Sequence, residues 1–208
     1  MNHHTKRFIL LTQAHTKITS SDLQSQGRLD IVLHSIITAL FASHTFREDT
    51  QLEIILMGPP LNPRKIRMQF AQEHTLSKKN LKRAIEIALK KCKSTDELEV
   101  LPGVFVCEID PQEYIQNTLE DETKYCAILD SYGKYFESFN EEISKIIKQK
   151  HSKYNEIVYF LGDHEGIDKK TKKLLKKQAH RISLGNQMYF TSQVCTILHY
   201  EMDKLNEQ

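Results

Sequence analysis

The sequence lacks the patterns that mark several common classes of protein. No apolar stretch among its 208 residues approaches the length of about 20 that a membrane-spanning helix needs. Its four cysteines form no Cys-x-x-Cys pair, so we expect neither a zinc cage nor a redox dithiol, but buried thiols of a cytoplasmic protein. The sequence has no Gly-x-Gly-x-x-Gly motif and no Walker A loop, which argues against a Gly-rich dinucleotide-binding turn and a P-loop. It also has no His-Glu-x-x-His motif and no nucleophile elbow, which argues against a zinc protease and a serine hydrolase.

The composition is typical of one soluble globular domain. Hydrophobic residues make up 39% and charged residues 27% of the 208 residues, and no repeat, low-complexity tract or long linker divides them. We therefore expect a single domain over residues 1–208. The formal net charge of +2 excludes no class of partner.

Positive charge is concentrated in one segment. Residues 169–181, KKTKKLLKKQAHR, carry seven Lys or Arg and no acid. Such a block is most often the solvated face of a helix. Because it follows a glycine-bracketed loop, it is also a candidate for holding a phosphate backbone beside whatever that loop binds.

Short apolar segments alternate with amphipathic ones along the chain. Strands are expected over 7–13, 52–58, 65–70, 103–109, 125–129, 156–162 and 180–184. Helices are expected over 28–44, 78–92, 137–150 and 190–206, over the basic block, and from Asp110, where an N-cap precedes Pro111. This alternation predicts an α/β fold with a mostly parallel sheet covered on both faces.

Two glycine turns stand where a ligand is expected in such a fold. GDHEGI, residues 162–167, follows an apolar strand, and SLGNQ, residues 183–187, follows another about twenty residues later. Ligands of open α/β sheets lie outside the carboxyl ends of the strands. We therefore expect these turns to form two walls of one pocket, in which main-chain amides and carbonyls hold a purine.

Three segments in fixed order resemble one known family. They are ITSSDLQSQGRLD (18–30), FLGDHEGI (160–167), and RISLG (181–185) followed by TSQVCTILHYEMD (191–203). Together they resemble the archaeal tRNA pseudouridine-54 N1-methyltransferase family of the SPOUT class. The resemblance implies an α/β domain with a deep C-terminal trefoil knot, about 125–208, that binds S-adenosylmethionine and forms a homodimer. No metal is implied.

The resemblance also implies which residues hold the cofactor. The pocket is implied to have walls at Gly162 and at the turn of residues 183–187, and to be completed by Leu129 and Val194. From the residues alone, ordinary packing in the core explains Leu129 and Val194 equally well. Family members often carry Ser-Pro where this chain has Gly185 and Asn186. The expected cofactor residues are Leu129, Gly162, Leu184, Gly185, Asn186, Gln187, Met188, Tyr189 and Val194.

The Gly-Arg-x-Asp element at residues 27–30 is implied to face the target base. Pseudouridine is joined to ribose through C5, so its N1–H is free to be replaced by a methyl group. Asp30 is the expected acceptor of the N1 proton, and Arg28 is expected to hold a phosphate or polarise a carbonyl of the base. Asp22, on the side that faces the RNA, is the alternative carboxylate. From the residues alone, helix capping or a surface salt bridge explains Arg28 and Asp30 equally well.

A base in the T-loop of tRNA is stacked and must be turned out into the pocket. Basic side chains from two regions are expected to bind the displaced backbone: Arg64, Lys65, Arg67, Lys172, Lys173, Lys176 and Lys177.

The last helix is expected to form the homodimer contact. Its apolar positions Val194, Ile197, Leu198, Met202 and Leu205 form a broad stripe, whose alternative explanation is packing within one chain. Two other functions remain open: methylation of pseudouridine in small-subunit rRNA, and RNA binding by a knotted protein without catalysis.

Overall fold

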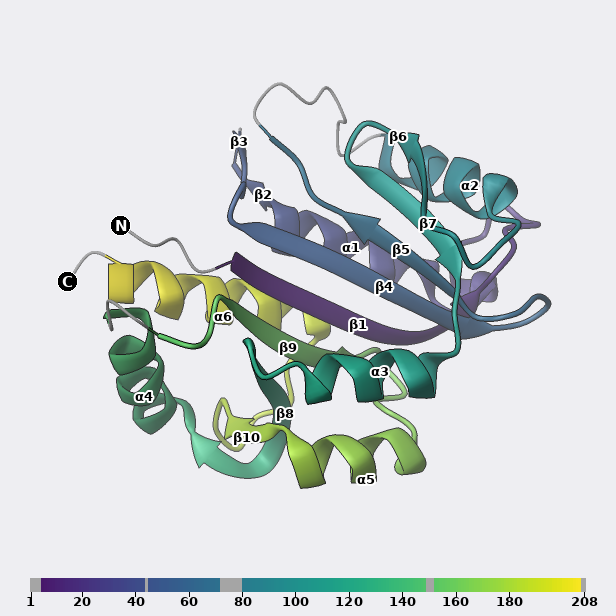
Figure 1. Ribbon diagram of the computed structural model, residues 1–208. Helices are drawn as coiled ribbons and strands as arrows, with labels where there is room; N and C mark the ends of the chain where they lie inside the picture. Colours follow the sequence, from purple (N-terminus) through teal and green to yellow (C-terminus); the bar gives the residue numbers. More distant parts are fainter. Residues whose placement is uncertain (1–4, 44, 72–79, 149–151, 207–208) are drawn as a thin grey trace.

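The computed structural model describes residues 5–43, 45–71, 80–148 and 152–206, which contain one eight-stranded sheet between two layers of helices (Figure 1). The strand order is β10-β8-β9-β1-β4-β5-β7-β6. The first five in this order are parallel: β10 (His180–Ser183), β8 (Lys124–Tyr135), β9 (Glu156–Gly162), β1 (Thr5–His15) and β4 (Thr50–Gly58). The last three are antiparallel: β5 (Arg64–Met68), β7 (Val104–Glu108) and β6 (Leu98–Leu101). The predicted α/β fold with a mostly parallel sheet is confirmed. A separate hairpin joins β2 (Phe41–Ala42) to β3 (Thr45–Phe46).

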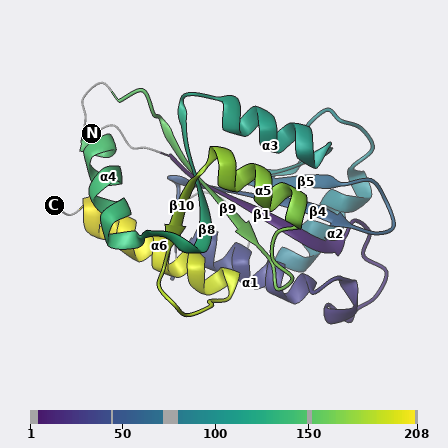
Figure 2. The ribbon, with the colours of Figure 1, turned by 90° about the horizontal axis from the view of Figure 1, so that it is seen from below.

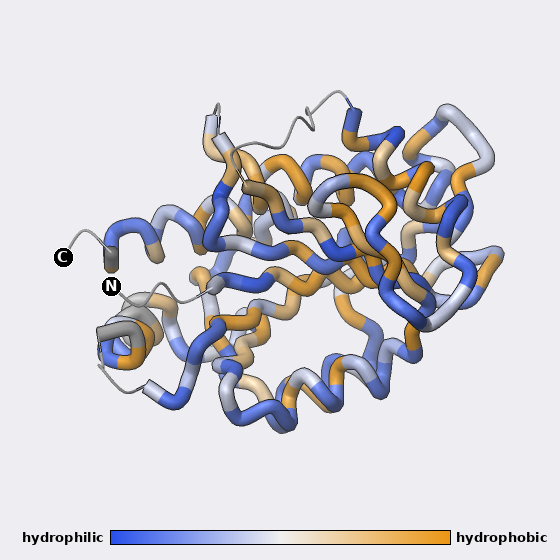
Figure 3. Tube along the Cα trace, turned by 45° about the horizontal axis from the view of Figure 1, so that its top comes forward, coloured by the Kyte–Doolittle hydropathy of each residue, from blue (hydrophilic) through white to orange (hydrophobic). Residues whose placement is uncertain are grey.

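The alternation of side chains along each strand divides the core into two parts. On β1, Phe8 and Leu10 belong to one apolar cluster, and Ile9 and Leu11 belong to another on the opposite face. The helices of the first face are α1 (Leu29–Leu40), α2 (Leu81–Lys91), α4 (Phe136–Lys148) and α6 (Thr191–Asn206), and those of the second are α3 (Pro111–Glu120) and α5 (Lys169–Gln178). Figure 3 shows the hydrophobic residues gathered in the central strands, so both sheet faces need a cover of helices.

Two helices begin as local chemistry requires. Asp110 accepts hydrogen bonds from the amides of Gln112 and Glu113 and precedes Pro111, which confirms the predicted cap of α3. Asp168 caps α5 in the same way through the amides of Lys170 and Thr171, a cap that the sequence pattern did not reveal.

Other expectations concern the limits of the helices and the thiols. The helix expected over 78–92 has its first two residues outside the described part of the chain. The helix expected over 137–150 has its last two residues outside it. All four cysteines are buried and free, as expected. No helix among the described residues is long and apolar enough to cross a bilayer. The same residues contain no cluster of three or more His, Cys, Asp or Glu side chains that could hold a metal.

Candidate functional site

A cavity of about 270 Å³ lies at the carboxyl end of β9, beside the middle of β8 (residues 128–131) and the turn that follows β10. These three strands are neighbours in the sheet (Figure 2), so the two glycine turns form one site, as their positions predicted. Of the residues expected at the cofactor, the cavity is lined by Leu129, Gly162, Leu184, Gly185, Gln187, Met188, Tyr189 and Val194. Asn186 is exposed and does not line the cavity.

The first wall is the tight loop of residues 162–167, which favours glycine at positions 162 and 166. A Cβ at Gly162 would lie 2.8–2.9 Å from backbone atoms of Gly166 and Ile167, and Gly166 itself has a φ of +77°. Asp163 closes the loop, because its carboxylate accepts hydrogen bonds from the amides of Gln13 at 2.8 Å and Glu165 at 2.9 Å. The loop is therefore attached to the end of β1 as well as to itself.

The second wall is attached to the first. Gly185 has a φ of +105°, and its amide donates to the hydroxyl of Ser183 at 3.2 Å. Thr191, at the start of α6, donates its hydroxyl to the carbonyl of Gly162. The side chains of Asp163, Ser183 and Thr191 thus hold the two walls in place. The resemblance did not name them as site residues, and their position next to the glycine turns was the only signal in the sequence that could have identified them.

A buried carboxylate lies in the middle of β8. The side chain of Asp130 is only 3% exposed and lies 2.9 Å from the ammonium of Lys176 and 2.7 Å from the guanidinium of Arg181. Burial would raise the pKa of Asp130, but hydrogen bonds from the two cations lower it below its ordinary value. This ionic cluster joins α5 and β10 to β8. The strand was expected over 125–129 but continues to Tyr135, and Asp130 lies just beyond the part of β8 that pairs with β9.

The Gly-Arg-x-Asp element forms a left-handed turn before α1. Gly27 has a φ of +66° and Arg28 a φ of +58°, a conformation uncommon for a side chain other than glycine. Arg28 holds Asp30 through two parallel hydrogen bonds of 3.0 and 2.9 Å. The salt-bridge alternative is therefore realised. Arg28 occupies the N-cap without a side-chain cap bond, and backbone amides of Asp30 and Ile31 also help to lower the pKa of the Asp30 carboxyl.

This turn and the cavity meet at one residue of β1. The amide of Gln13 donates to Asp163 in the cavity wall, and a Cβ at Gly27 would lie 2.4 Å from the carbonyl oxygen of Gln13. Gly27 thus lies directly against Gln13. Asp22, by contrast, is exposed and accepts from the amide of Gln24 at 3.0 Å. The fold brings the turn that carries Arg28 and the cavity loop onto the same strand end.

Comparison with known families assigns the chain to one of them. The model of a family described as "Putative SAM-dependent RNA methyltransferase" matches residues 5–207. The chain belongs to this family. Among curated proteins, the tRNA (pseudouridine(54)-N(1))-methyltransferase of Pyrococcus abyssi is 27% identical over 95% of this chain and 96% of its own length. Its counterpart in Methanopyrus kandleri is 29% identical over 90% of this chain and 85% of its own length.

The fold of this methyltransferase also has a solved counterpart. Archaeoglobus fulgidus Nep1, crystallised with S-adenosylhomocysteine, superposes with a TM-score of 0.63 and covers 99% of this chain and 100% of its own, at 12% identity. At that identity the likeness concerns the fold.

The cavity of this methyltransferase fits an adenosine-containing cofactor. The side chains of Leu129, Leu184 and Val194 offer apolar contacts to a purine, and the turns at Gly162 and Gly185 offer main-chain polar groups. The volume of about 270 Å³ is near the lower end for ligand pockets, which suits one nucleoside with a short extension.

The basic side chains expected at the RNA have different surroundings. Arg64 is only 5% exposed and donates to the carbonyl oxygens of Thr16 and Leu89, so it stabilises the fold and is not part of a surface. Lys65 and Arg67 share the carboxylate of Glu97.

On α5, Lys176 pairs with Asp130, and Lys172 lines the cavity. Lys173 and Lys177 are exposed and make no ion pair with any described residue.

Lys173 and Lys177 offer the cleanest test of RNA binding by α5. Their joint replacement by Glu is expected to weaken tRNA binding and flatten its dependence on salt, because fewer counterions are released. Lys176 is left intact, since its loss would leave Asp130 with one cation fewer at the cavity. The measurement is tRNA affinity at several salt concentrations, with S-adenosylhomocysteine affinity as the control. An unchanged salt slope would make α5 a solvated face.

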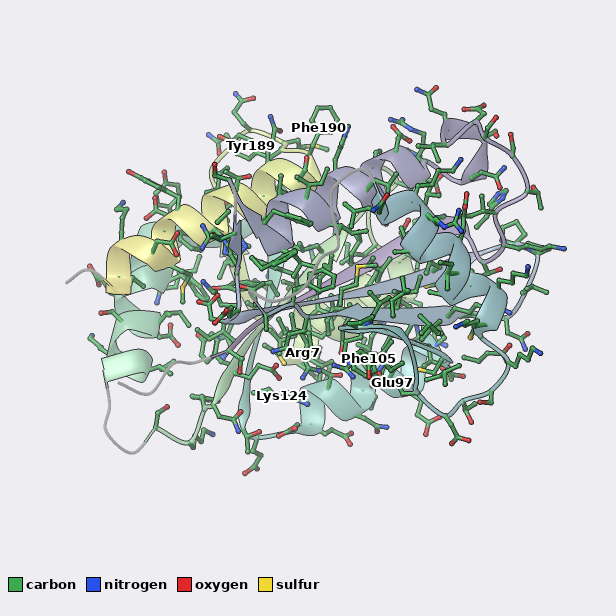
Figure 4. The ribbon with its side chains drawn as sticks, turned by 90° about the horizontal axis from the view of Figure 1, so that it is seen from above. Arg7, Glu97, Phe105, Lys124, Tyr189 and Phe190 are labelled. Atoms are coloured by element: carbon green, nitrogen blue, oxygen red, sulfur yellow. The ribbon has the colours of Figure 1, made fainter. Side chains whose placement is uncertain are left out.

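The apolar stripe of α6 serves its own chain. Leu198 and Met202 are buried, and Val194 and Leu205 pack against the same core. Intramolecular packing therefore accounts for these four side chains, whereas Ile197, the fifth residue of the stripe, is half-buried and belongs to neither core cluster. Large apolar side chains are instead exposed just before α6 and on its outer side: Met188, Tyr189, Phe190 and Tyr200. Figure 4 shows Tyr189 and Phe190 outside the start of α6, on the side of the sheet opposite Arg7 and Lys124.

Proposed function

We propose that this protein transfers a methyl group from S-adenosylmethionine to N1 of pseudouridine 54 in the T-loop of tRNA. The observation that carries the proposal is the contact at Gln13, where Gly27 of the turn that precedes α1 lies against the strand end that also holds the cavity loop. The curated relatives carry this activity in their names and match almost the whole chain. We further propose that Leu129, Gly162 and residues 184–189 with Val194 hold the cofactor.

The reaction requires no covalent bond between the protein and either reactant. The bound cofactor supplies a methyl group already activated on a sulfonium. The protein has to hold the base with N1 facing that methyl group, exclude water, and accept hydrogen bonds from N1–H as the new N–C bond forms. A T-loop base must be turned out of its stack to reach the cavity, which gives the exposed cations of α5 a role in holding the backbone.

The ion pair assigns different tasks to Arg28 and Asp30. The hydrogen bonds from Arg28 lower the pKa of Asp30 below its ordinary value, so the carboxylate is ionised at neutral pH and retains a proton poorly. Asp30 then acts as a hydrogen-bond acceptor for N1–H, with the proton passing on to water. Arg28 keeps guanidinium donors for a carbonyl of the base or a phosphate, because Asp30 occupies only one edge of the group.

The direct test is methylation of tRNA that contains pseudouridine at position 54, with labelled cofactor and nucleoside mass spectrometry. The expected product is N1-methylpseudouridine, absent when the same tRNA carries uridine 54, because the N1 of uridine is bonded to ribose. Product from both substrates, or from neither, would refute the proposal. A small-subunit rRNA fragment with pseudouridine tests the ribosomal alternative, and failure to bind S-adenosylhomocysteine would favour the non-catalytic one.

We also propose that residues from about 125 to 208 form a deep trefoil knot within a single domain, residues 1–208, of a cytoplasmic enzyme. In support, β10 returns to pair with β8 after β9 has been added on the other side of β8, and Thr191 then ties the start of α6 to Gly162. One continuous eight-stranded sheet supports the single domain.

A homodimer is proposed on different residues from those of the α6 stripe. Met188 is 97% and Phe190 68% exposed, beside the cavity, and a second copy is the occupant that would shield them. Light scattering at micromolar concentration is expected to give twice the mass of the 24.3 kDa chain. Phe190→Asp should shift the mass toward the monomer, whereas Lys173→Asp on the opposite layer should not. A monomeric wild type would refute the dimer.

A further inference from the structure

Three charged side chains line the cavity, and two of them are already engaged. Asp130 is paired with Lys176 and Arg181. Asp163 accepts from the amides of Gln13 and Glu165. The third is Lys172, an exposed side chain at the edge of the cavity, whose ammonium makes no ion pair or hydrogen bond with any described residue. The cavity therefore presents one uncommitted charge, and that charge is positive.

The helix that carries Lys172 is firmly placed. The residue before it, Thr171, is 1% exposed and accepts a hydrogen bond of 2.7 Å from the side chain of Gln112 on α3. Leu175, one turn further on, is fully buried in the core. Successive residues of an α-helix differ by about 100° around its axis, so Lys173 leaves the helix in another direction and does not line the cavity. The fold, and not the charge block as such, selects Lys172.

We propose that Lys172 binds the carboxylate of the cofactor's amino-acid end. S-adenosylmethionine carries a positive sulfonium, a positive ammonium and one carboxylate, so a lining cation has one favourable partner on it. A carboxylate that leaves water for a cavity needs a charged or strongly hydrogen-bonding partner. Lys172 therefore belongs to cofactor recognition and not to the RNA surface in which its sequence neighbours placed it. The inference deepens the proposed function, since it needs the cofactor but not the pseudouridine target.

The test compares two ligands that differ only in the carboxylate. Calorimetry is carried out with S-adenosylhomocysteine and with its decarboxylated analogue, which keeps the adenosine, the thioether and the ammonium. Lys172→Gln is expected to weaken S-adenosylhomocysteine roughly three- to tenfold, the scale of one charged hydrogen bond at a partly exposed rim, and to leave the analogue unchanged. Lys173→Gln, the matched control, should change neither affinity, and Lys172→Arg should retain most of the affinity for S-adenosylhomocysteine.

Two results would overturn the assignment. An equal loss for both ligands would mean that Lys172 acts through packing or local structure. Unchanged binding of S-adenosylhomocysteine together with weaker tRNA binding would return Lys172 to the RNA surface. A wild type that binds S-adenosylhomocysteine but fails to methylate tRNA would refute the proposed function and leave the ligand comparison intact.

Discussion

Gly162→Ala is expected to weaken binding of S-adenosylhomocysteine roughly five- to 150-fold, because overpacking of this kind typically costs about 1–3 kcal/mol. The sequence predicted that Gly162 forms one wall of the cofactor pocket. The structure places the added Cβ 2.8–2.9 Å from the backbone of Gly166 and Ile167, so the loop has to move. The loss of affinity then comes from a displaced cavity wall. Calorimetry measures it.

Gly166→Ala is the matched control in the same loop. A Cβ there meets nothing within 4 Å, although the φ of +77° strains any residue other than glycine. We expect a modest loss of thermal stability for this variant and S-adenosylhomocysteine affinity within a few-fold of wild type. If Gly162→Ala binds as well as Gly166→Ala, the loop at 162–167 is not a wall of the cofactor site.

Asp30→Asn is expected to slow single-turnover methylation at least roughly tenfold, the low side of the 10²- to 10⁴-fold typical of general-base groups, with tRNA and cofactor affinities within a few-fold. The asparagine keeps the shape but not the charge that accepts a hydrogen bond from N1–H. Rapid-quench kinetics with saturating enzyme separates this step from binding.

Asp22→Asn provides the matched control, because Asp22 is a carboxylate on the same segment that accepts only a local hydrogen bond, from Gln24. It should leave the single-turnover rate unchanged. A normal rate for Asp30→Asn together with a slow Asp22→Asn would transfer the role to Asp22.

The pH dependence follows from the ion pair of Asp30 with Arg28. Hydrogen bonds from Arg28 lower the pKa of Asp30 below its ordinary value, so the pair's stabilisation is present above the unfolded pKa and is lost as the pH falls through the lower folded pKa. Asp30 consequently stays ionised throughout pH 5 to 9. If the wild-type rate rises with pH between 5 and 9, the rise reports the ionisation of another group, such as N1–H of the base. Asp30→Asn should then leave the midpoint pH of that rise unchanged.

Local chemistry in the sequence was enough to predict the cavity walls. Gly162 and Gly185 each follow a short strand, and the alternation of strands with helices makes the sheet mostly parallel, so the two turns reach the same edge. The cap at Asp110 was also predictable, because the two amides that it binds lie only two and three residues away in the sequence. Residues such as Asp163 and Thr191 were not, because their partners Gln13 and Gly162 are distant in the chain.

By itself, the sequence determined the kind of fold, the positions of the two glycine turns and the family, because these depend on patterns within short segments. Only the tertiary structure decided the partner of each charge. Seven basic side chains looked alike in the sequence, yet Arg64 is buried, Lys176 is bound to Asp130 and Lys172 faces the cavity. The physical reason is that the strength and use of a charge depend on burial and on nearby counter-charges, and here those come from elements tens of residues away.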